Sequence, residues 1–361
     1  MKIVGIDIRL SNNQRGISSY ITNLLINYQG LVPDSNIKVY LISDRNPTDE
    51  IKKLNYKIII LPIRFYPLWD FIIPFILFFY KINLFHAPGN STPFFKIGKI
   101  KYVVTIHDLI FYNTKFSGNL YQKFGRLYLK FNVWLNIFRA DKIISVSNST
   151  KLDILKRFYI PESRISVVYE SCHSEFFSKS RKDFCSLNNF ICFGSDDPRK
   201  NTELILETFD TFFSEYNNFY LDVVGLSESY IHELKIKLRL KNEKNFIFHS
   251  HISRKQLVFI YENSIALVYP SLYEGFGVPI VEAFKTNTPV ITSNVSSLPE
   301  IAEDAGIFVN PYSKSDLLKA LHFIIIRENF DLYCLKSKER SFDFDWELFS
   351  KQTLAIYHEE V

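Results

Sequence analysis

Short apolar stretches alternate with longer amphipathic stretches along the whole chain, and this alternation limits the folds open to it. Thirteen stretches have the composition of buried strands, at residues 2–8, 38–43, 57–62, 84–86, 102–107, 142–147, 165–169, 190–193, 220–224, 245–248, 265–269, 289–292 and 306–309. Segments between them have helical apolar spacing, at residues 18–27, 120–138, 149–158, 201–215, 228–240, 254–262 and 315–327. Such alternation predicts an α/β fold with parallel sheets covered by helices.

The pattern runs through two successive sets of strands, which predicts two domains. The chain has 361 residues, more than one typical core accommodates. Between the sets lies a polar, non-periodic segment, SCHSEFFSKSRKDFCSLNN. We therefore expect doubly wound, Rossmann-like domains at residues 1–170 and 171–340 that face a central cleft, since ligands bind at the carboxyl ends of parallel strands.

The two halves of the chain differ in charge. Residues 1–170 hold 23 Lys and Arg against 11 Asp and Glu, whereas residues 171–361 hold 20 against 27. The basic first half indicates an anionic partner, which an anionic membrane surface or a phosphorylated lipid would supply. No nucleic-acid-binding motif is visible, so we expect no nucleic acid partner.

The most apolar segment, FIIPFILFFY at residues 71–80, is too short to span a membrane and contains Pro74. Together with residues 58–61 and 65–69 it forms a hydrophobic, aromatic and basic region. Two interpretations stay open for it: a core helix, which we favour, or a surface that dips into lipid headgroups.

The four cysteines and the N-terminus both indicate the cytoplasm. Cys172, Cys185, Cys192 and Cys334 form no CxxC pair and match no zinc spacing, so we expect buried free thiols in a reducing compartment. The opening MKIVGIDIRL carries charges inside its apolar run and is not a signal peptide.

The stretch SLYEGFGVPIVEAF at residues 271–284 reads as strand end, glycine bend and helix start. Gly275 and Gly277 let backbone amides turn towards a ligand, and Pro279 suits the beginning of a helix. Glu282 would lie in its first turn. A helix N-terminus after such a bend is suited to bind phosphate. Two carboxylates flank it here, and they would accept hydrogen bonds from sugar hydroxyls. The alternative is an ordinary turn whose acidic residues favour the helix dipole.

Two motifs in the first half would also lie at strand ends. Gly16 precedes a helix, where its amide can approach an anion, although a plain connector explains it nearly as well. In VVTIHDLIF, His107 would donate a hydrogen bond to a hydroxyl or shuttle a proton, with Asp108 orienting it. A structural His–Asp pair is the more common explanation of such a dipeptide.

The stretch ICFGSDDPRKNTELIL brings Arg199 and Lys200 to a helix start that Asn201 or Thr202 would cap. Cations there suit a diphosphate leaving group. The adjacent Asp196–Asp197 pair is an incomplete metal site beside competing cations, so we expect no metal.

These motifs together resemble the retaining glycosyltransferases of family 4, which have the two-domain GT-B fold. The resemblance extends over almost the whole chain. The stretches that match the family are Arg15-Gly16-Ile17, TIHDL at 105–109, ADKIISVS at 140–147, PRKN at 198–201, YEGFGVPIVE at 273–282, TPVI at 288–291 and LPE at 298–300. The last segment, residues 341–361, is similar to the family's final helix, which crosses back to the N-terminal domain.

The resemblance implies a role for each matching residue. His107, Glu274 and Lys200 would be catalytic: His107 touches the donor sugar near the reacting carbon, Glu274 binds that sugar, and Lys200 neutralises the leaving diphosphate. The other donor-binding residues would be Gly16, Arg199, Gly275, Phe276, Gly277, Val278 and Glu282, the last on the ribose hydroxyls. Many members have Arg where this chain has Ser195.

The implied activity is metal-free transfer of a hexose, with retention, from a nucleotide-diphosphate sugar in the synthesis of surface polysaccharide such as O-antigen or capsule. Mannose from GDP-mannose is the favoured donor, with dTDP-rhamnose or a UDP-hexose as alternatives. The acceptor would be a glycan or a polyprenyl-diphosphate-linked acceptor, at the inner face of the plasma membrane. A non-catalytic scaffold with this fold is the alternative class. A nicotinamide-dependent dehydrogenase is disfavoured because no GxGxxG follows the first strand.

Overall fold

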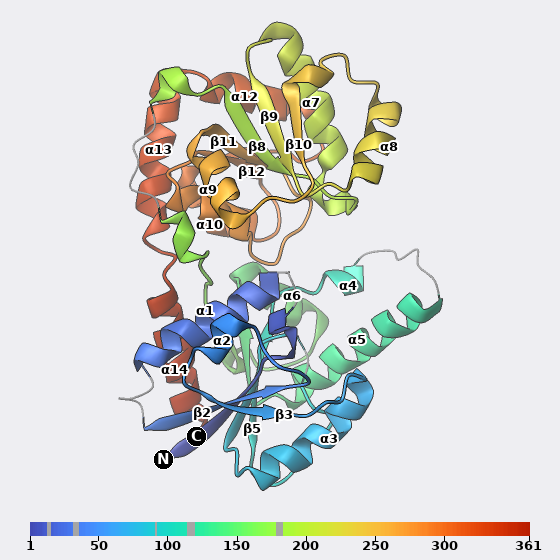
Figure 1. Ribbon diagram of the computed structural model, residues 1–361, viewed down its shortest axis with the longest axis vertical. Coiled ribbons are helices and arrows are strands. Elements are labelled where there is room, and N and C mark those ends of the chain that lie inside the picture. The colour runs from blue at the N-terminus through green and yellow to red at the C-terminus, as the bar shows by residue number, and fades with distance from the viewer. Residues whose placement is uncertain (13–15, 32–35, 91, 114–119, 178–182) are drawn as a thin grey trace. The chain divides into compact units, whose positions relative to one another are not determined.

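The computed structural model describes residues 1–12, 16–31, 36–90, 92–113, 120–177 and 183–361. Arg15, part of the first motif above, lies outside these ranges. The chain divides into unit 1, made of Met1–Ser171 together with Asp345–Val361, and unit 2, Cys172–Phe344. Figure 1 shows the course of the chain. Within the described residues, no helix combines the length and the apolarity that a membrane crossing requires.

Unit 1 is built on a parallel sheet with strand order β3-β2-β1-β4-β5-β6-β7. Its strands are β1 (Lys2–Asp7), β2 (Ile37–Ser43), β3 (Lys57–Ile60), β4 (Leu84–Ala87), β5 (Lys101–Ile106), β6 (Lys142–Ser145) and β7 (Ile165–Val167). Its helices are α1 (Gly16–Leu31), α2 (Asp49–Lys52), α3 (Tyr66–Phe79), α4 (Ile110–Asn113), α5 (Leu120–Arg139), α6 (Asn148–Arg157) and α14 (Trp346–Glu360).

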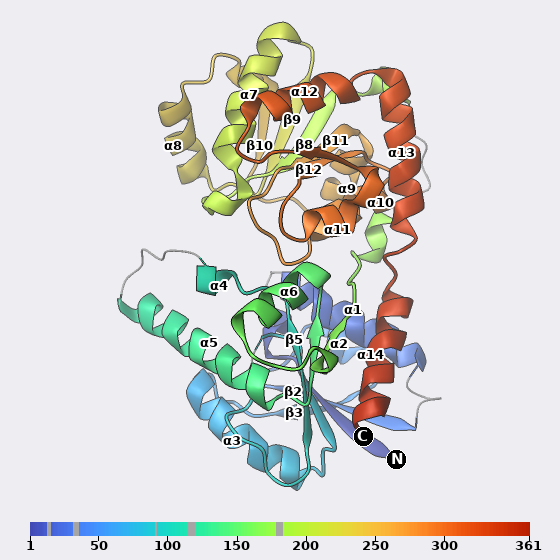
Figure 2. The ribbon, with the colours of Figure 1, turned by 180° about the vertical axis from the view of Figure 1, so that it is seen from behind.

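Successive residues along β2, β5 and β6 enter different cores. On β2, Tyr40 and Ile42 pack with α3, α5 and α6, whereas Val39 and Leu41 pack with α1, α2 and α14. This two-sided burial explains why the strands read as continuous apolar runs. Figure 2 shows α3 and α5 beside one another.

Helix α14 completes the second of these cores from the far end of the chain. Tyr357 is fully buried, and its hydroxyl lies 2.5 Å from Nδ1 of His86 on β4. The other ring nitrogen of His86 lies 2.9 Å from the Thr105 hydroxyl, and burial lowers the pKa of this imidazole to about 3. A neutral histidine therefore joins β4, β5 and α14 inside unit 1.

Unit 2 has a parallel sheet with strand order β10-β9-β8-β11-β12-β13. Its strands are β8 (Asn189–Phe193), β9 (Tyr220–Val224), β10 (Phe246–His249), β11 (Ser264–Tyr269), β12 (Val290–Ser293) and β13 (Gly306–Val309). Its helices are α7 (Thr202–Glu215), α8 (Glu228–Leu238), α9 (Arg254–Glu262), α10 (Val278–Lys285), α11 (Leu298–Ala302), α12 (Lys314–Ile324) and α13 (Arg327–Ser341).

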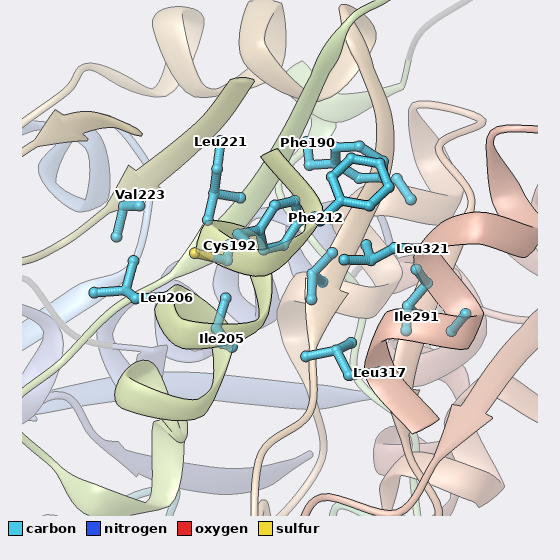
Figure 3. Packing of buried hydrophobic residues seen from close by; sticks show 14 of the residues in the cluster. Phe190, Cys192, Ile205, Leu206, Phe212, Leu221, Val223, Ile291, Leu317 and Leu321 are labelled. Carbon is cyan, nitrogen blue, oxygen red and sulfur yellow. The ribbon is translucent and has the colours of Figure 1, made fainter. Parts of the chain in front are cut away.

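Aromatic packing fills one face of the unit 2 sheet. Phe190 of β8 lies 5.2 Å and 5.9 Å, centroid to centroid, from Phe209 and Phe212 of α7. Leu317 and Leu321 of α12 close the same cluster (Figure 3). Such edge-to-face contacts stabilise a core beyond the area that they bury.

Two expectations about this architecture were wrong in detail. The helix expected over 315–327 ends at Ile324, and a separate helix, α13, follows it. All four cysteines are free, but only Cys172 and Cys192 are buried, while Cys185 is exposed.

Candidate donor site

The unit 2 strand order reverses between β8 and β11, and two of the motifs follow these two strands. In doubly wound sheets, ligands bind at this switch point, beyond the carboxyl ends of the strands. A short 3-10 turn, η6 (Pro198–Lys200), follows β8, and the glycine bend follows β11. Lys200 and Glu274 are thus brought to one place from positions 74 residues apart.

Lys200, Tyr269 and Glu274 form a closed triangle of hydrogen bonds. Lys200 Nζ donates to the Tyr269 hydroxyl and to Glu274 Oε1, each at 2.7 Å, and the hydroxyl donates to the same Oε1 at 2.7 Å. Burial, and then the charge of Glu274, raise the pKa of Tyr269 well above its usual value, so its hydroxyl stays a donor. The triangle fixes the ammonium and the carboxylate against each other.

Each charged group in the triangle keeps bonding capacity for a ligand. Lysine has three N–H donors, and described residues accept two of those on Lys200. Within the same part of the chain, the hydrogen bonds to the Glu274 carboxylate all end on Oε1. The remaining ammonium proton suits a phosphate oxygen, and Oε2 suits a sugar hydroxyl.

Two serines of the β12–α11 connection form hydrogen bonds with the backbone of the glycine bend. Ser297 Oγ donates to the Phe276 carbonyl at 2.8 Å, and Ser296 Oγ lies 3.2 Å from the Glu274 amide nitrogen. Gly277 precedes α10 with φ 114°, a backbone conformation that a side chain would strain. The Phe276 ring is buried against Phe344, 6.0 Å between centroids, so its side chain packs in the core of unit 2.

Glu282 lies one residue beyond the first turn of α10, not in that turn as expected, because the helix begins at Val278. Its Oε2 accepts a hydrogen bond from the buried Tyr261 hydroxyl at 3.0 Å. Burial raises the pKa of Glu282 to about 7, opposed by the Tyr261 bond and by the charge of Arg254. A carboxylate desolvated to this degree is typical of functional sites.

Arg199 is less available than the sequence indicated. Its Nε and Nη2 donate to Asp197 Oδ2 at 2.9 Å and 2.6 Å, so its charge is already paired. The same carboxylate caps η6, which explains Asp197 without a metal. Among the described residues, no three His, Cys, Asp or Glu side chains form a cluster that could hold a metal ion.

The expected helix cap at Asn201 is wrong. Asn201 adopts φ 58°, and its amide donates to the Pro270 and Pro311 carbonyls at 3.1 Å and 2.6 Å instead of capping α7. These bonds tie the start of α7 to the segments that follow β11 and β13. Thr202 Oγ1 accepts from the Ser195 amide at 3.0 Å, which fixes the backbone before η6.

Gly16 and His107 belong to unit 1. Gly16 is the first residue of α1 and is exposed, and no atom of the described residues lies within 4 Å of where a Cβ would lie. The expectation that Asp108 orients His107 was wrong. His107 Nε2 lies 2.8 Å from the Pro88 carbonyl and must donate to it, while Asp108 accepts from the Ile110 amide. Burial lowers the pKa of His107, so Nδ1 of the neutral ring is an acceptor.

Sequence reasoning missed Tyr261 and Tyr269 as site residues. Both are buried aromatic residues in apolar surroundings, where a core role is the default expectation. The one signal was the position of Tyr269 at the end of a predicted strand, directly before the glycine bend.

The two units thus define a class: proteins with two doubly wound domains, one of which carries a glycine bend flanked by two carboxylates. Solved structures of this class are similar over nearly the whole chain. WaaG, a glycosyltransferase involved in lipopolysaccharide biosynthesis, matches with a TM-score of 0.73 at 15% identity, over 98% of this chain and 99% of that one. Anabaena HepE in complex with UDP-glucose matches with a TM-score of 0.74 at 15% identity, over both chains completely.

Sequence comparisons assign the family. Residues 16–173 match the model of Glycosyltransferase Family 4, and residues 177–339 match that of Glycosyl transferases group 1. The chain therefore belongs to the family 4 glycosyltransferases of the GT-B fold.

Two curated relatives are O-antigen chain mannosyltransferases. The O-antigen chain mannosyltransferase RfbU of Salmonella typhimurium is 30% identical over 212 residues, which are 58% of this chain and 56% of that protein. The O-antigen chain mannosyltransferase B of Escherichia coli is 25% identical over 294 residues, 77% of this chain and 74% of that protein. The match thus spans little more than half the length of the Salmonella protein.

Proposed function

We propose that this protein is a retaining mannosyltransferase that transfers mannose from GDP-mannose to a glycan linked to polyprenyl diphosphate. The Lys200–Tyr269–Glu274 triangle at the switch point of unit 2 is the observation that carries the proposal, because it places one cation and one carboxylate where a nucleotide-sugar would lie. The mannosyltransferase relatives favour mannose.

The donor would lie along the glycine bend. Ionised Glu282 would accept the ribose hydroxyls, the Lys200 ammonium and the N-terminus of α10 would neutralise the diphosphate, and Glu274 would hold the sugar. Gly275, Phe276, Gly277 and Val278 would contribute backbone contacts. With this cationic support we propose that no metal or other cofactor takes part.

Retention would follow from attack on the face from which the diphosphate leaves. The bond between the anomeric carbon and the phosphate oxygen breaks, the acceptor oxygen bonds to the same carbon, and the acceptor proton passes to the departing diphosphate. Lys200 would stabilise the charge that develops on that diphosphate. His107 Nδ1 would accept a hydrogen bond from a hydroxyl of the donor sugar.

The first experiment measures the thermal shift of wild type and Glu282→Ala with GDP, UDP, dTDP and ADP, with and without EDTA. We expect GDP alone to stabilise wild type, equally with EDTA, and the variant to lose the effect. A response to UDP or dTDP would instead favour a UDP-hexose or dTDP-rhamnose donor. No response to any nucleotide would favour a non-catalytic scaffold. An α-linked product from GDP-mannose, identified by NMR, would establish retention.

The proposed location is the cytoplasm at the inner face of the plasma membrane, where a polyprenyl-linked acceptor is anchored. The supporting observation is the excess of Lys and Arg in the first half of the chain.

A further inference from the structure

Helix α3 exposes an apolar face in addition to the one that it buries. Trp69, Ile73 and Leu77 enter the core, as expected for one face of a surface helix. On the outer side lie large apolar side chains at helical spacing, Leu68, Phe71, Phe75, Phe78 and Phe79, with 45% to 76% of their surface exposed. The segment is therefore a core helix, as we favoured, and its outer side carries exposed aromatic residues.

Helix α5 carries a second exposed stripe. Leu127, Phe131, Trp134 and Phe138 lie on its outer side, and Trp134 contacts Phe131 and Phe138 with ring centroids 6.2 Å and 5.2 Å apart. Water-soluble proteins rarely leave continuous apolar patches of this kind without a partner. Together, these nine residues of α3 and α5 form what we call the aromatic face.

Beside the apolar residues that enter the core, a few polar side chains join α3 to α5. Asn132 Nδ2 of α5 donates at 2.7 Å to Asp70 of α3, whose carboxylate also accepts from the Tyr128 hydroxyl. Asn136 continues this ladder by donating to Asn132 at 2.6 Å. The hydrogen bonds fix α3 against α5, and Figures 1 and 2 show the two helices side by side.

Basic residues border the aromatic face. Lys81 and Lys99, both exposed, line a pocket with Phe75, Phe78 and Phe79 at the end of α3. Residues 57–139, which include both helices, hold eleven Lys and Arg against two acidic residues, Asp70 and Asp108. These features favour a partner that has an apolar interior and an anionic surface.

We propose that the aromatic face docks on an anionic lipid bilayer. Aromatic side chains partition into the headgroup layer, and neighbouring lysines add attraction to anionic lipids. A second copy of the chain is disfavoured as occupant, because it would oppose one basic surface to another. The inference deepens the proposed function by naming the surface that meets a lipid-linked acceptor, but its test uses neither donor nor acceptor.

The chain contains its own reporter for this contact. Of its three tryptophans, Trp69 and Trp346 are buried, and Trp134 on the aromatic face is 47% exposed. Vesicles of phosphatidylglycerol should shift the Trp emission to shorter wavelength, and bilayers with brominated acyl chains should quench it. Phosphatidylcholine vesicles should do neither. Trp134→Phe should abolish the spectral change while flotation with the vesicles persists.

Variants then test the surface itself. Phe71→Ser/Phe75→Ser should weaken vesicle binding at least tenfold, and Lys81→Glu/Lys99→Glu should remove its sensitivity to salt. Phe259→Ser on α9, an equally exposed phenylalanine of unit 2, is the matched control and should bind as wild type. Melting temperature, and the nucleotide response described above, should be unchanged in all three.

Three results would overturn the inference. One is the absence of flotation with anionic vesicles. Another is binding that the Phe71/Phe75 variant retains, which would mean adsorption by charge alone. The third is a dimer in lipid-free solution that this variant disrupts, which would assign the face to a second copy of the chain. A failed nucleotide response with intact vesicle binding would refute only the donor site.

Discussion

Replacement of Glu282 by Gln tests the donor site through the stability of unit 2. The Glu282 carboxyl has a pKa of about 7 in the folded chain against 4.5 for a free Glu side chain, mainly because it is buried. A pKa increase of this size corresponds to a free-energy penalty of about 3 kcal/mol on the ionised carboxylate. Since the side chain keeps some contact with water, we expect about 2 kcal/mol to be recovered by Gln at high pH.

The sign of the effect depends on pH. Below pH 4.5 the carboxyl is protonated in the folded and unfolded chain, and the penalty is absent. Between pH 4.5 and 7 the unfolded chain ionises this group while the folded chain keeps the proton, so wild type loses stability over this range. Gln can still accept the hydrogen bond from Tyr261 and never ionises. The free energy of unfolding of the variant should therefore exceed that of wild type increasingly as pH rises.

Thermal melts at pH 5 and pH 8 measure this difference. For a unit of this size about 2 kcal/mol raises Tm by roughly 4 to 8 °C, so Glu282→Gln should melt that much higher at pH 8 and close to wild type at pH 5. The exposed Glu339→Gln on α13 is the control and should change little. A Tm difference that is the same at both pH values would refute the argument.

Nucleotide binding should show the opposite trend. If ionised Glu282 holds the ribose, wild type should bind about tenfold more tightly at pH 8 than at pH 6, because the ionised fraction falls from about nine tenths to about one tenth. Calorimetric titration of wild type beside Glu282→Gln separates this from titration of the nucleotide itself. Parallel pH profiles for the two proteins would exclude the ribose role.

Three further perturbations test other parts of the structure. Lys200→Met should lower diphosphate affinity at least tenfold by calorimetry, whereas Arg199→Met, whose charge is already paired, should lower it less; equal losses would contradict the pairing. Tyr357→Phe should cost about 1 to 3 kcal/mol in urea unfolding, because His86 loses a buried partner; an effect below 0.5 kcal/mol would refute this. Gly277→Ala should destabilise unit 2 by about 1 to 3 kcal/mol and reduce nucleotide binding, measured by Tm and calorimetry, since φ is 114° there; an unchanged Tm would mean that the bend tolerates a side chain.

The fold was predictable because both sheets are buried on both faces. All thirteen predicted strands are present within one to two residues at each end, since parallel strands covered by helices must be apolar along their length. Helix α13 was missed for the complementary reason. It buries only Phe330, Ser337 and Ser341, so its sequence carries almost no apolar period.

Local motifs were enough to predict the donor-site residues. They do not show which of these residues contact one another in the fold. Glycines, a proline and nearby charges mark a phosphate-binding bend within ten residues of sequence. The bond between Lys200 and Glu274 joins residues 74 apart, and the pairing of Arg199 with Asp197 depends on the shape of a single turn. Neither arrangement has a periodic signature.

Helix α14 has a consequence for how this chain is made. Unit 1 cannot finish its second core until Trp346, Phe349 and Tyr357 leave the ribosome, although its strands are complete by residue 167. Synthesis of the intervening residues takes about 10 to 40 s at ordinary rates. During that interval the side of α1 that carries Tyr20 and Tyr28 has no cover. Unit 2, continuous in sequence, can fold first, so the nascent chain should need a chaperone longest at its earliest-made residues.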